Sequence, residues 1–314
     1  MNQLKKSKHK KYLIIFIYTF VIVAMLGVSG TFVWQHSSIY RKEKITSSKI
    51  KPPKIIINIK EKQFPSKNVQ AVQIQQKRFP TNHNETADQW AYKTEEIREQ
   101  MKGSIDENKP KTVFLTFDDG PSTNITPRIL KILSDHNVYA TFFLVGNRIT
   151  PETQNIIKQE YDNGNGIAVH SFTHDYKVLY PNRVPDSQAI LREAIQTRNL
   201  LKDFLGTNFD TQVWRYPGGT ISWKNLDENE ILMKENGFHW IDWNAATGDG
   251  VGAKGPKTVE DTVNYHAMSI SLYPKSNVEV ILMHDSSDKE LTVQSLPSII
   301  NYYKERGYQF GILD

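Results

Sequence analysis

Between residues 112 and 314, short apolar runs alternate with longer amphipathic segments, and this alternation is the feature that most constrains the fold. TVFLTF (112–117) is apolar and β-branched, which is typical of a buried strand. The segment 126–136 then carries apolar residues at helical spacing, with Pro127 in its first turn. Strand and helix alternate six or seven times in this way. The pattern predicts an α/β fold in which helices cover a parallel sheet, either open or closed into a barrel.

The remaining elements follow from the same two periodicities. Further strands are expected at 139–145, 167–171, 213–217, 238–243, 278–284 and 308–313, and further helices at 151–164, 186–206, 226–237, 258–272 and 291–307. In folds of this type, the loops at the carboxyl ends of the strands build the functional site. Polar motifs that directly follow strands are therefore the candidates for chemistry.

The N-terminal part of the chain has a different character. Residues 12–34 contain no charged side chain, and 23 residues of helix span about 34 Å, enough to cross a bilayer core of roughly 30 Å. Five lysines precede this run, so the positive-inside rule predicts a cytoplasmic tail at 1–11, a single-pass membrane anchor at 12–34 and an extracellular body. The alternative is a cleaved signal peptide with small residues at 28–30, which would make the protein secreted.

Residues 35–111 are rich in Lys, Gln, Asn and Ser and contain several prolines. This composition predicts an extracellular stalk, and a small accessory region is the alternative. Within it, 55–59 favours a short strand and 90–101 a helix. The main domain is expected to occupy 112–314.

Charge and cysteine content exclude several classes of function. Residues 1–111 hold 21 Lys and Arg against 9 Asp and Glu, whereas residues 112–314 hold 18 against 25, so the formal charge of +5 belongs to the leader and stalk. An acidic body argues against nucleic-acid binding, because tracking phosphates requires positive charge on the folded domain. With no cysteine, a disulfide scaffold, cysteine-ligated zinc, cysteine-bound iron–sulfur clusters and thiol nucleophiles are excluded.

Two motifs at strand ends suggest a metal site. The first strand runs into DDGP (118–121), where adjacent carboxylates are costly unless something neutralises them, although an N-cap and a turn aspartate would explain this motif alone. The third strand ends at His170, and His174 follows at a spacing that lets two imidazoles bind one metal. One Asp and two His form an oxygen-plus-nitrogen site that suits Zn²⁺ and could accept Co²⁺, Mn²⁺ or Ni²⁺.

Two further motifs lie at the same edge of the predicted sheet. RYPGG (215–219) places Arg215 where it can bind a carboxylate in bidentate geometry, and Pro-Gly-Gly can aim a backbone N–H at an oxyanion. A turn with a surface arginine is the simpler interpretation. LMHD (282–285) brings His284 to this edge, and histidine is readily tuned to give a proton near neutral pH.

TFDDGP, HSFTH, RYPGG and LMHD, in this order, resemble the motifs of the polysaccharide deacetylases of carbohydrate esterase family 4, the NodB-homology domain. The resemblance covers about residues 112–314. It implies a distorted (β/α) barrel and the metal-dependent removal of acetyl groups from N-acetylated sugars. One divalent cation is implied, with Zn²⁺ expected and Co²⁺, Mn²⁺ or Ni²⁺ as alternatives.

The resemblance also implies roles for individual residues. Asp118 corresponds to the general base, Arg215 to the residue that orients it, and His284 to the general acid. The metal ligands of the family correspond to Asp119, His170 and His174. The backbone N–H of Tyr216 corresponds to the oxyanion donor. The substrate-binding positions implied or inferred nearby are Leu282, which would line the pocket for the acetyl methyl, Pro217, Gly218 and Trp223.

One position departs from the family pattern. The family often carries an Asp-Trp pair, with the Asp tuning the catalytic His and the Trp walling the acetate pocket. In WIDWNAATGDG (240–250), Asp249 matches the Asp, and Gly250 then stands where Trp is common. Asp242 and Trp243 are the other candidate pair, but they lie inside the predicted strand 238–243. Among the tryptophans, Trp223 is the expected sugar-stacking surface, and Trp214, Trp240 and Trp243 are expected in the core or the pocket lining.

The anchor and stalk would place the site a short distance outside the membrane, where peptidoglycan lies in a bacterium. The leading hypothesis is therefore a deacetylase acting on N-acetylglucosamine of peptidoglycan or a related N-acetylated glycan. The runner-up is an O-acetyl esterase on xylan or another acetylated polysaccharide, since esters and amides share a tetrahedral intermediate. A glycan-binding protein on an inactive enzyme scaffold is the third hypothesis. The oligomeric state is not indicated.

Overall fold

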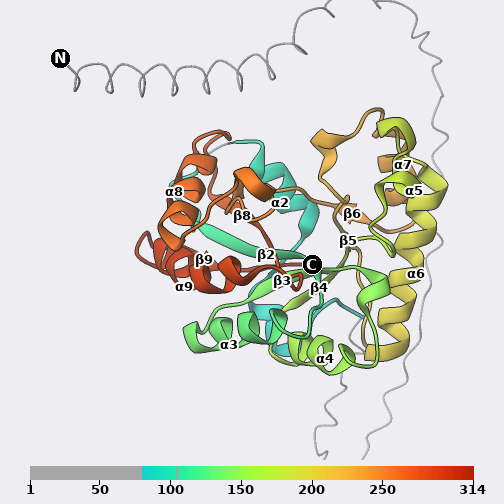
Figure 1. Cartoon of the computed structure of the whole chain (residues 1–314), viewed down its shortest axis with the longest axis horizontal. Coiled ribbons are helices and arrows are strands. Elements are labelled where there is room, and N and C mark those ends of the chain that lie inside the picture. Colours follow the sequence, from blue (N-terminus) through green and yellow to red (C-terminus); the bar gives the residue numbers. More distant parts are fainter. Residues whose placement is uncertain (1–79, 104) are drawn as a thin grey trace, which may run out of the picture. The chain divides into compact units, whose positions relative to one another are not determined.

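The computed structural model describes residues 80–103 and 105–314 (Figure 1). The tail expected at 1–11, the anchor at 12–34 and the strand at 55–59 lie outside the described residues. Among the helices within them, none combines the length and the apolar character that a bilayer crossing requires.

A curled sheet of parallel strands forms the centre of the fold and confirms the predicted α/β class. From one edge to the other, its strands are β6 (His239–Trp240), β5 (Val213–Trp214), β4 (Gly166–Val169), β3 (Ala140–Leu144), β2 (Thr112–Gly120), β8 (Val278–His284) and β7 (Ala245–Ala246). A further strand, β9 (Gln309–Phe310), pairs with the start of β2. Each neighbouring pair runs parallel, so the carboxyl ends of the strands meet at one rim.

The sheet is a curled half-barrel, which specifies the distorted (β/α) barrel implied by the family resemblance. Within the described residues, no hydrogen-bonded pairing joins the edge strands β6 and β7. Instead, residues 241–244 pass directly from one edge to the other, and we call them the crossing segment. The N–H of Ile241 donates to Trp214 O of β5 at 3.0 Å, and the N–H of Asn244 donates to Val280 O of β8 at 3.1 Å. The predicted strand 238–243 is therefore shorter, because its second half leaves β6 to make this crossing.

Helices pack on the outer face of the sheet (Figure 1). They are α3 (Thr126–His136), α4 (Gln154–Asp162), α6 (Ser187–Leu205), α7 (Asp227–Glu235), α8 (Val259–Ile270) and α9 (Glu290–Lys304), and they correspond to the six predicted helices. Shorter elements join them: α5 (Tyr176–Leu179), η1 (Glu85–Gln89), η2 (Gly146–Arg148), η3 (Pro181–Arg183), η4 (Thr220–Ser222) and η5 (Gly252–Lys254).

The alternation along β2 explains how the sheet positions a site. Val113, Leu115 and Phe117 belong to the core between the sheet and the outer helices, whereas Phe114 belongs to a second core inside the curl. Because side chains alternate between the two faces of a strand, Asp118 falls on the inner face at the rim. The curl of the sheet therefore gathers the inward-facing side chains at the strand ends around one space.

The folded domain begins earlier than the predicted boundary at residue 112. Strand β1 (Ala91–Tyr92) pairs with β10 (Ile312–Leu313) at the C-terminus. Helix α2 (Thr94–Met101) packs against both β6 and β8, and its Ile97 is buried in the inner core. Trp90 stacks on Tyr139 with ring centroids 3.8 Å apart. Residues 80–111 thus belong to the domain rather than to a stalk, because their few apolar side chains fill space that the half-barrel leaves open.

Candidate active site

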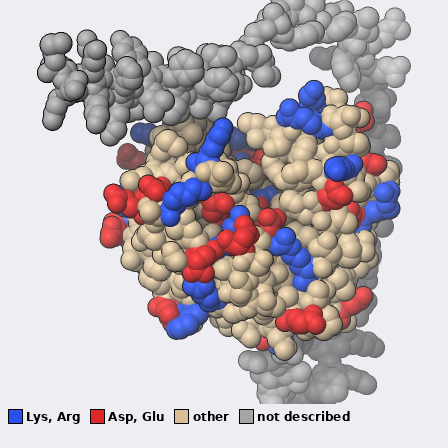
Figure 2. All heavy atoms as spheres, in the orientation of Figure 1, with Lys and Arg blue, Asp and Glu red and all other residues tan. Residues whose placement is uncertain are grey.

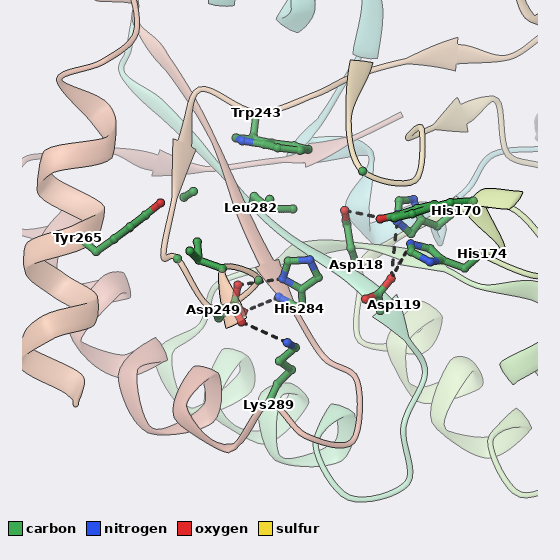
Figure 3. A pocket seen from close by; sticks show the side chains of 16 residues that line it. Asp118, Asp119, His170, His174, Trp243, Asp249, Tyr265, Leu282, His284 and Lys289 are labelled. Carbon is green, nitrogen blue, oxygen red and sulfur yellow. Dashed lines mark hydrogen bonds and ion pairs between the residues drawn. The ribbon is translucent and has the colours of Figure 1, made fainter. Parts of the chain in front are cut away.

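A cavity of about 380 Å³ opens at the carboxyl ends of β2, β4 and β8 (Figure 3). The predicted side chains Asp118, Asp119, His170, His174 and His284 all line it. These residues come from three separate strand ends, and the parallel sheet brings them to one rim. The motifs singled out in the sequence therefore belong to a single site.

Asp119, His170 and His174 form a cluster that could hold a metal ion. One ligand atom from each side chain lies within 4.8 Å of the other two. The Nε2 atom of His174 is 3.2 Å from Asp119 Oδ1, and Nε2 of His170 is 3.7 Å from the same oxygen. Burial lowers the pKa of His170 to about 4, so its imidazole is neutral at pH 7 and its free nitrogen is available as a ligand.

The loop that carries both histidines is held from behind. Nδ1 of His170 donates to the carbonyl of Arg215 at 2.9 Å, which directs Nε2 toward the cluster, since a carbonyl oxygen can only accept. Glu193 of α6 accepts hydrogen bonds from the N–H groups of Phe172 and Thr173 at 3.0 and 2.9 Å. The loop backbone is unusual, because His174 has φ +56°, a left-handed conformation that residues other than glycine rarely adopt.

Asp118 is fixed by a fully buried arginine. Nη1 of Arg215 donates to Asp118 Oδ1 at 2.8 Å and to Thr116 Oγ1 at 2.7 Å. The guanidinium also lies 4.0 Å from the ring centre of Phe143. The other carboxylate oxygen, Oδ2, is 3.7 Å from Nε2 of His170 and faces the candidate metal ligands. A charge-assisted contact of this kind keeps Asp118 in one orientation with one oxygen available for proton transfer.

His284 is paired with Asp249, as predicted. Nδ1 of His284 donates to Asp249 Oδ1 at 2.8 Å, and the backbone N–H of His284 donates to Oδ2 at 2.8 Å. Thr292 of α9 also donates to Oδ2, at 2.7 Å, and Lys289 donates to the Asp249 carbonyl at 3.1 Å. Asp242, the other sequence candidate, instead accepts from the N–H of Thr220 and has no contact with His284 among the described residues.

The pairing changes the proton affinity of His284. Burial acts to lower its pKa, but the negative charge of Asp249 and the hydrogen bond to it outweigh burial and raise the pKa to about 9. His284 is consequently protonated at neutral pH. A protonated imidazole that lines the pocket can donate a proton to a leaving group.

Two of the four predicted substrate-binding residues line the pocket, and two do not. Leu282 and Gly218 line the pocket, whereas Pro217 and Trp223 are not among the lining residues. The Trp223 ring stacks on Tyr180 at 3.7 Å, and its indole N–H donates to the Pro217 carbonyl at 2.8 Å, so it supports the rim from outside. Trp223 thus lies outside the pocket, and its role as a sugar-stacking surface stays a prediction.

The predicted oxyanion donor is a backbone group beside a buried side chain. The Tyr216 ring is 0% exposed and packs against Trp214 in the core. Among the described residues, its N–H has no hydrogen-bond acceptor. The oxyanion role of Tyr216 stays a prediction.

Several residues at the site escaped prediction. Thr292, Lys289 and Glu193 hold the acid and the histidine loop, and Tyr265 lines the pocket. Trp243 also lines the pocket, which agrees with its expected place in the core or the pocket lining. Thr292, Glu193 and Tyr265 lie on helices, where amphipathic spacing already explains them, and Lys289 stands in a polar loop directly before α9. No motif distinguishes any of them. Only a polar side chain such as Glu193, buried within the apolar stripe of a helix, offered a signal.

Known proteins resemble this chain in sequence and in fold. The family model for polysaccharide deacetylase matches residues 105–233. A peptidoglycan-N-acetylglucosamine deacetylase from Bacillus cereus is 31% identical over 201 residues, 64% of this chain and 68% of the relative. A solved structure of a Streptococcus mutans CE4 esterase is 45% identical in sequence with a TM-score of 0.71, and the match covers 76% of this chain and 98% of that one. A solved polysaccharide deacetylase from Bacillus cereus is 30% identical, with a TM-score of 0.54, and covers 64% and 91%.

The fold and the site together define an amide-hydrolysing enzyme built on a curled parallel half-barrel. The chain belongs to the polysaccharide deacetylase family, carbohydrate esterase family 4. The resemblance stated from the four motifs is thereby confirmed.

Proposed function

We propose that this enzyme removes N-acetyl groups from N-acetylglucosamine residues of peptidoglycan, using one divalent cation, with Zn²⁺ as the expected ion. The observation that carries the proposal is that one pocket is lined by a carboxylate held by a buried arginine, by an Asp-His-His cluster that could hold a cation, and by a protonated histidine. Hydrolysis of an amide requires an activated water, stabilisation of a developing oxyanion and a proton for a poor amine leaving group. Each requirement has a candidate here.

The donor set fits a cation of this kind. One carboxylate and two imidazoles leave open positions for water and substrate, as catalytic zinc sites require, and Zn²⁺ accepts both ligand types. A divalent cation bound by Asp119, His170 and His174 supplies Lewis-acid chemistry that polarises a carbonyl oxygen and lowers the pKa of water from 15.7 toward about 7.

The protein's own groups carry the proton transfers. Asp118 takes the proton from the attacking water, because Arg215 occupies its Oδ1 and leaves Oδ2 facing the cluster. The Tyr216 N–H is our candidate for the oxyanion contact. His284 gives its proton to the nitrogen as the C–N bond breaks, and Asp249 stabilises the charged imidazole until that point. Leu282 provides an apolar surface for the acetyl methyl group.

The substrate and location rest on two further arguments. A relative with 31% identity is named a peptidoglycan-N-acetylglucosamine deacetylase, which supports the same sugar here. The uncharged run 12–34 supports a membrane-anchored enzyme that works outside the cell, where that polymer lies. On the face seen in Figure 2, Lys and Arg are interspersed with Asp and Glu, so recognition of the glycan must rely on more than net charge.

Acetate release tests the proposal. The full-length chain is purified in detergent, stripped with a chelator and reloaded with Zn²⁺ or Co²⁺. Acetate is then measured from N-acetylglucosamine oligomers, peptidoglycan and acetylated xylan. We expect acetate from the first two only after reloading, with new amines on glucosamine in the digested wall. Faster release from xylan would favour the O-acetyl esterase, and binding of glycan without any acetate would favour the non-catalytic alternative.

A further inference from the structure

The apolar side of the pocket is formed by the crossing segment and its neighbours. Trp243 of this segment lines the pocket together with Ala246 of β7, Tyr265 of α8 and Leu282 of β8. Ala246 and Leu282 are register partners on adjacent parallel strands, so the sheet sets their relative positions. Figure 3 shows Trp243, Leu282 and Tyr265 on the opposite side of the pocket from the candidate metal ligands. An acyl chain that points away from those ligands therefore meets this surface.

The indole of Trp243 is held in place by its surroundings. A Cβ atom placed on Gly219 would lie 2.5 Å from Cη2 of the indole, so a residue with a side chain at 219 would displace the ring. Gly219 also has φ +72°, which glycine adopts at little cost. Arg215 donates to the carbonyls of the two residues before Trp243, at 3.0 and 3.1 Å. Because the same guanidinium holds Asp118, one buried side chain positions both the base and this wall.

Residue 250 cannot serve as a wall of the pocket with this loop conformation. A Cβ atom placed on Gly250 would lie 2.7 Å from Cε1 of His284, so the backbone itself packs against the imidazole. Any side chain at 250 would need a different course of the loop. The apolar boundary of the pocket is consequently formed by the residues opposite the candidate metal ligands. Among these residues, Trp243 has the largest side chain.

We infer that Trp243 is a specificity-determining residue that limits the length of the acyl group removed from the sugar nitrogen. The inference rests on the proposed function. Hydrolysis breaks the amide C–N bond, joins the water oxygen to the acyl carbon and releases a carboxylic acid and an amine that takes its proton from His284. The acyl carbon stays beside the candidate metal ligands, so its chain extends toward Leu282 and Trp243. An acetyl group fits this space, and a longer chain meets the indole.

The test compares acyl chains within each enzyme preparation. Glucosamine oligomers carrying N-acetyl, N-propionyl or N-butyryl groups are given to the full-length, Zn²⁺-loaded wild type and to the variants Trp243→Ala, Trp243→Phe and Ala246→Val. Release of each carboxylic acid is measured, and the ratio of propionate to acetate is formed. The ratio does not depend on the fraction of folded enzyme, so partial unfolding of a variant does not obscure it. Trp240→Phe is the matched control, because Trp240 packs under Arg98 and does not line this pocket.

We expect Trp243→Ala to raise the ratio about tenfold or more, the size of the discrimination that one methylene produces in an apolar pocket. Trp243→Phe should raise it less, Ala246→Val should lower it, and Trp240→Phe should leave it unchanged. An unchanged ratio in Trp243→Ala and Trp243→Phe, with acetate still released, would overturn the inference and leave the proposed function intact. A wild type that releases no acid from any of the three substrates would instead contradict the proposed function.

Discussion

The two sides of the pocket are assembled in different ways. The base side, which comprises Asp118, Asp119, His170 and His174, comes from two short stretches of sequence at the ends of β2 and β4. The acid side is centred on His284 at the end of β8, but its partner Asp249 lies 35 residues earlier, and Thr292, which holds Asp249, lies 43 residues beyond that aspartate. The base side is thus encoded in motifs, and the acid side is assembled by packing.

The two sides of the pocket should therefore respond differently to substitutions. On the base side, the candidate base and the candidate metal ligands are themselves motif residues. A single substitution there should therefore abolish proton transfer or metal binding. On the acid side, the chemistry depends on a pKa that several distant residues maintain together. Substitutions on the acid side should therefore lower the activity by different amounts and shift its pH dependence.

The largest effect is expected from Asp118→Asn on the base side. Asparagine can still accept from Arg215 but cannot take a proton, so turnover should fall by a factor of roughly 10²–10⁴, the range typical of a general base. Zn²⁺ binding, measured by calorimetry, should persist because the three candidate ligands remain. Asp175→Asn is a suitable control, since this carboxylate caps α5 and does not line the pocket. Turnover retained in Asp118→Asn would refute the assignment of the base.

Asp249→Asn should produce the next largest effect, about 100-fold at neutral pH. Asp249 raises the pKa of His284 to about 9, so the acid form predominates below that pH and is lost as the pH rises through it. Without the negative charge of Asp249, burial lowers the pKa of His284, and only the charges of Asp118 and Asp119 still oppose it. The alkaline limb of kcat/KM against pH should therefore move to lower pH in the variant. If the alkaline limb stays in place in Asp249→Asn, the limb reports the titration of a group other than His284.

Thr292→Val should have a smaller effect on the same side. The substitution removes one hydrogen bond to the Asp249 carboxylate, which corresponds to a loss of about tenfold. The alkaline limb should shift in the same direction as in Asp249→Asn, but less. Thr292→Ser retains the hydroxyl and should restore both the rate and the limb, and failure of this rescue would indicate that Thr292 acts only through packing.

The smallest effect is expected from Trp223→Phe. The Trp223 ring is stacked on Tyr180 outside the pocket, and a phenyl ring can keep that contact. We expect kcat/KM on N-acetylglucosamine oligomers to change less than about twofold, because the ring lies outside the pocket and only its hydrogen bond to the Pro217 carbonyl is lost. A large rise in KM for the oligomers, with kcat unchanged, would instead show that Trp223 binds sugar. The substrate-binding surface would then reach beyond the strand ends on the base side.

Much of the fold was predictable because strands and helices leave different periodicities. The apolar, β-branched run at 112–117 indicated a buried strand, and the six outer helices followed from apolar spacing. The crossing segment was not predictable, because FHWIDW continues the pattern of a strand through the point where the chain leaves β6. The packing of residues 80–111 against the domain was also missed, although the helix expected at 90–101 is present as α2 (Thr94–Met101). Their average composition is polar, and only a few side chains such as Ile97 reveal that the segment is packed.

The sequence by itself determined the parallel α/β class, the family and the identity of the groups at the strand ends. It could do so because these groups lie in short motifs that the regular geometry of a parallel sheet brings to one rim. The tertiary structure alone showed that the sheet stays a half-barrel, that Thr292 and Lys289 hold Asp249, and that Trp243 walls the pocket rather than lying in the core. Those three features depend on the course of loops and on contacts between residues far apart in the chain, and local periodicity carries no information about either.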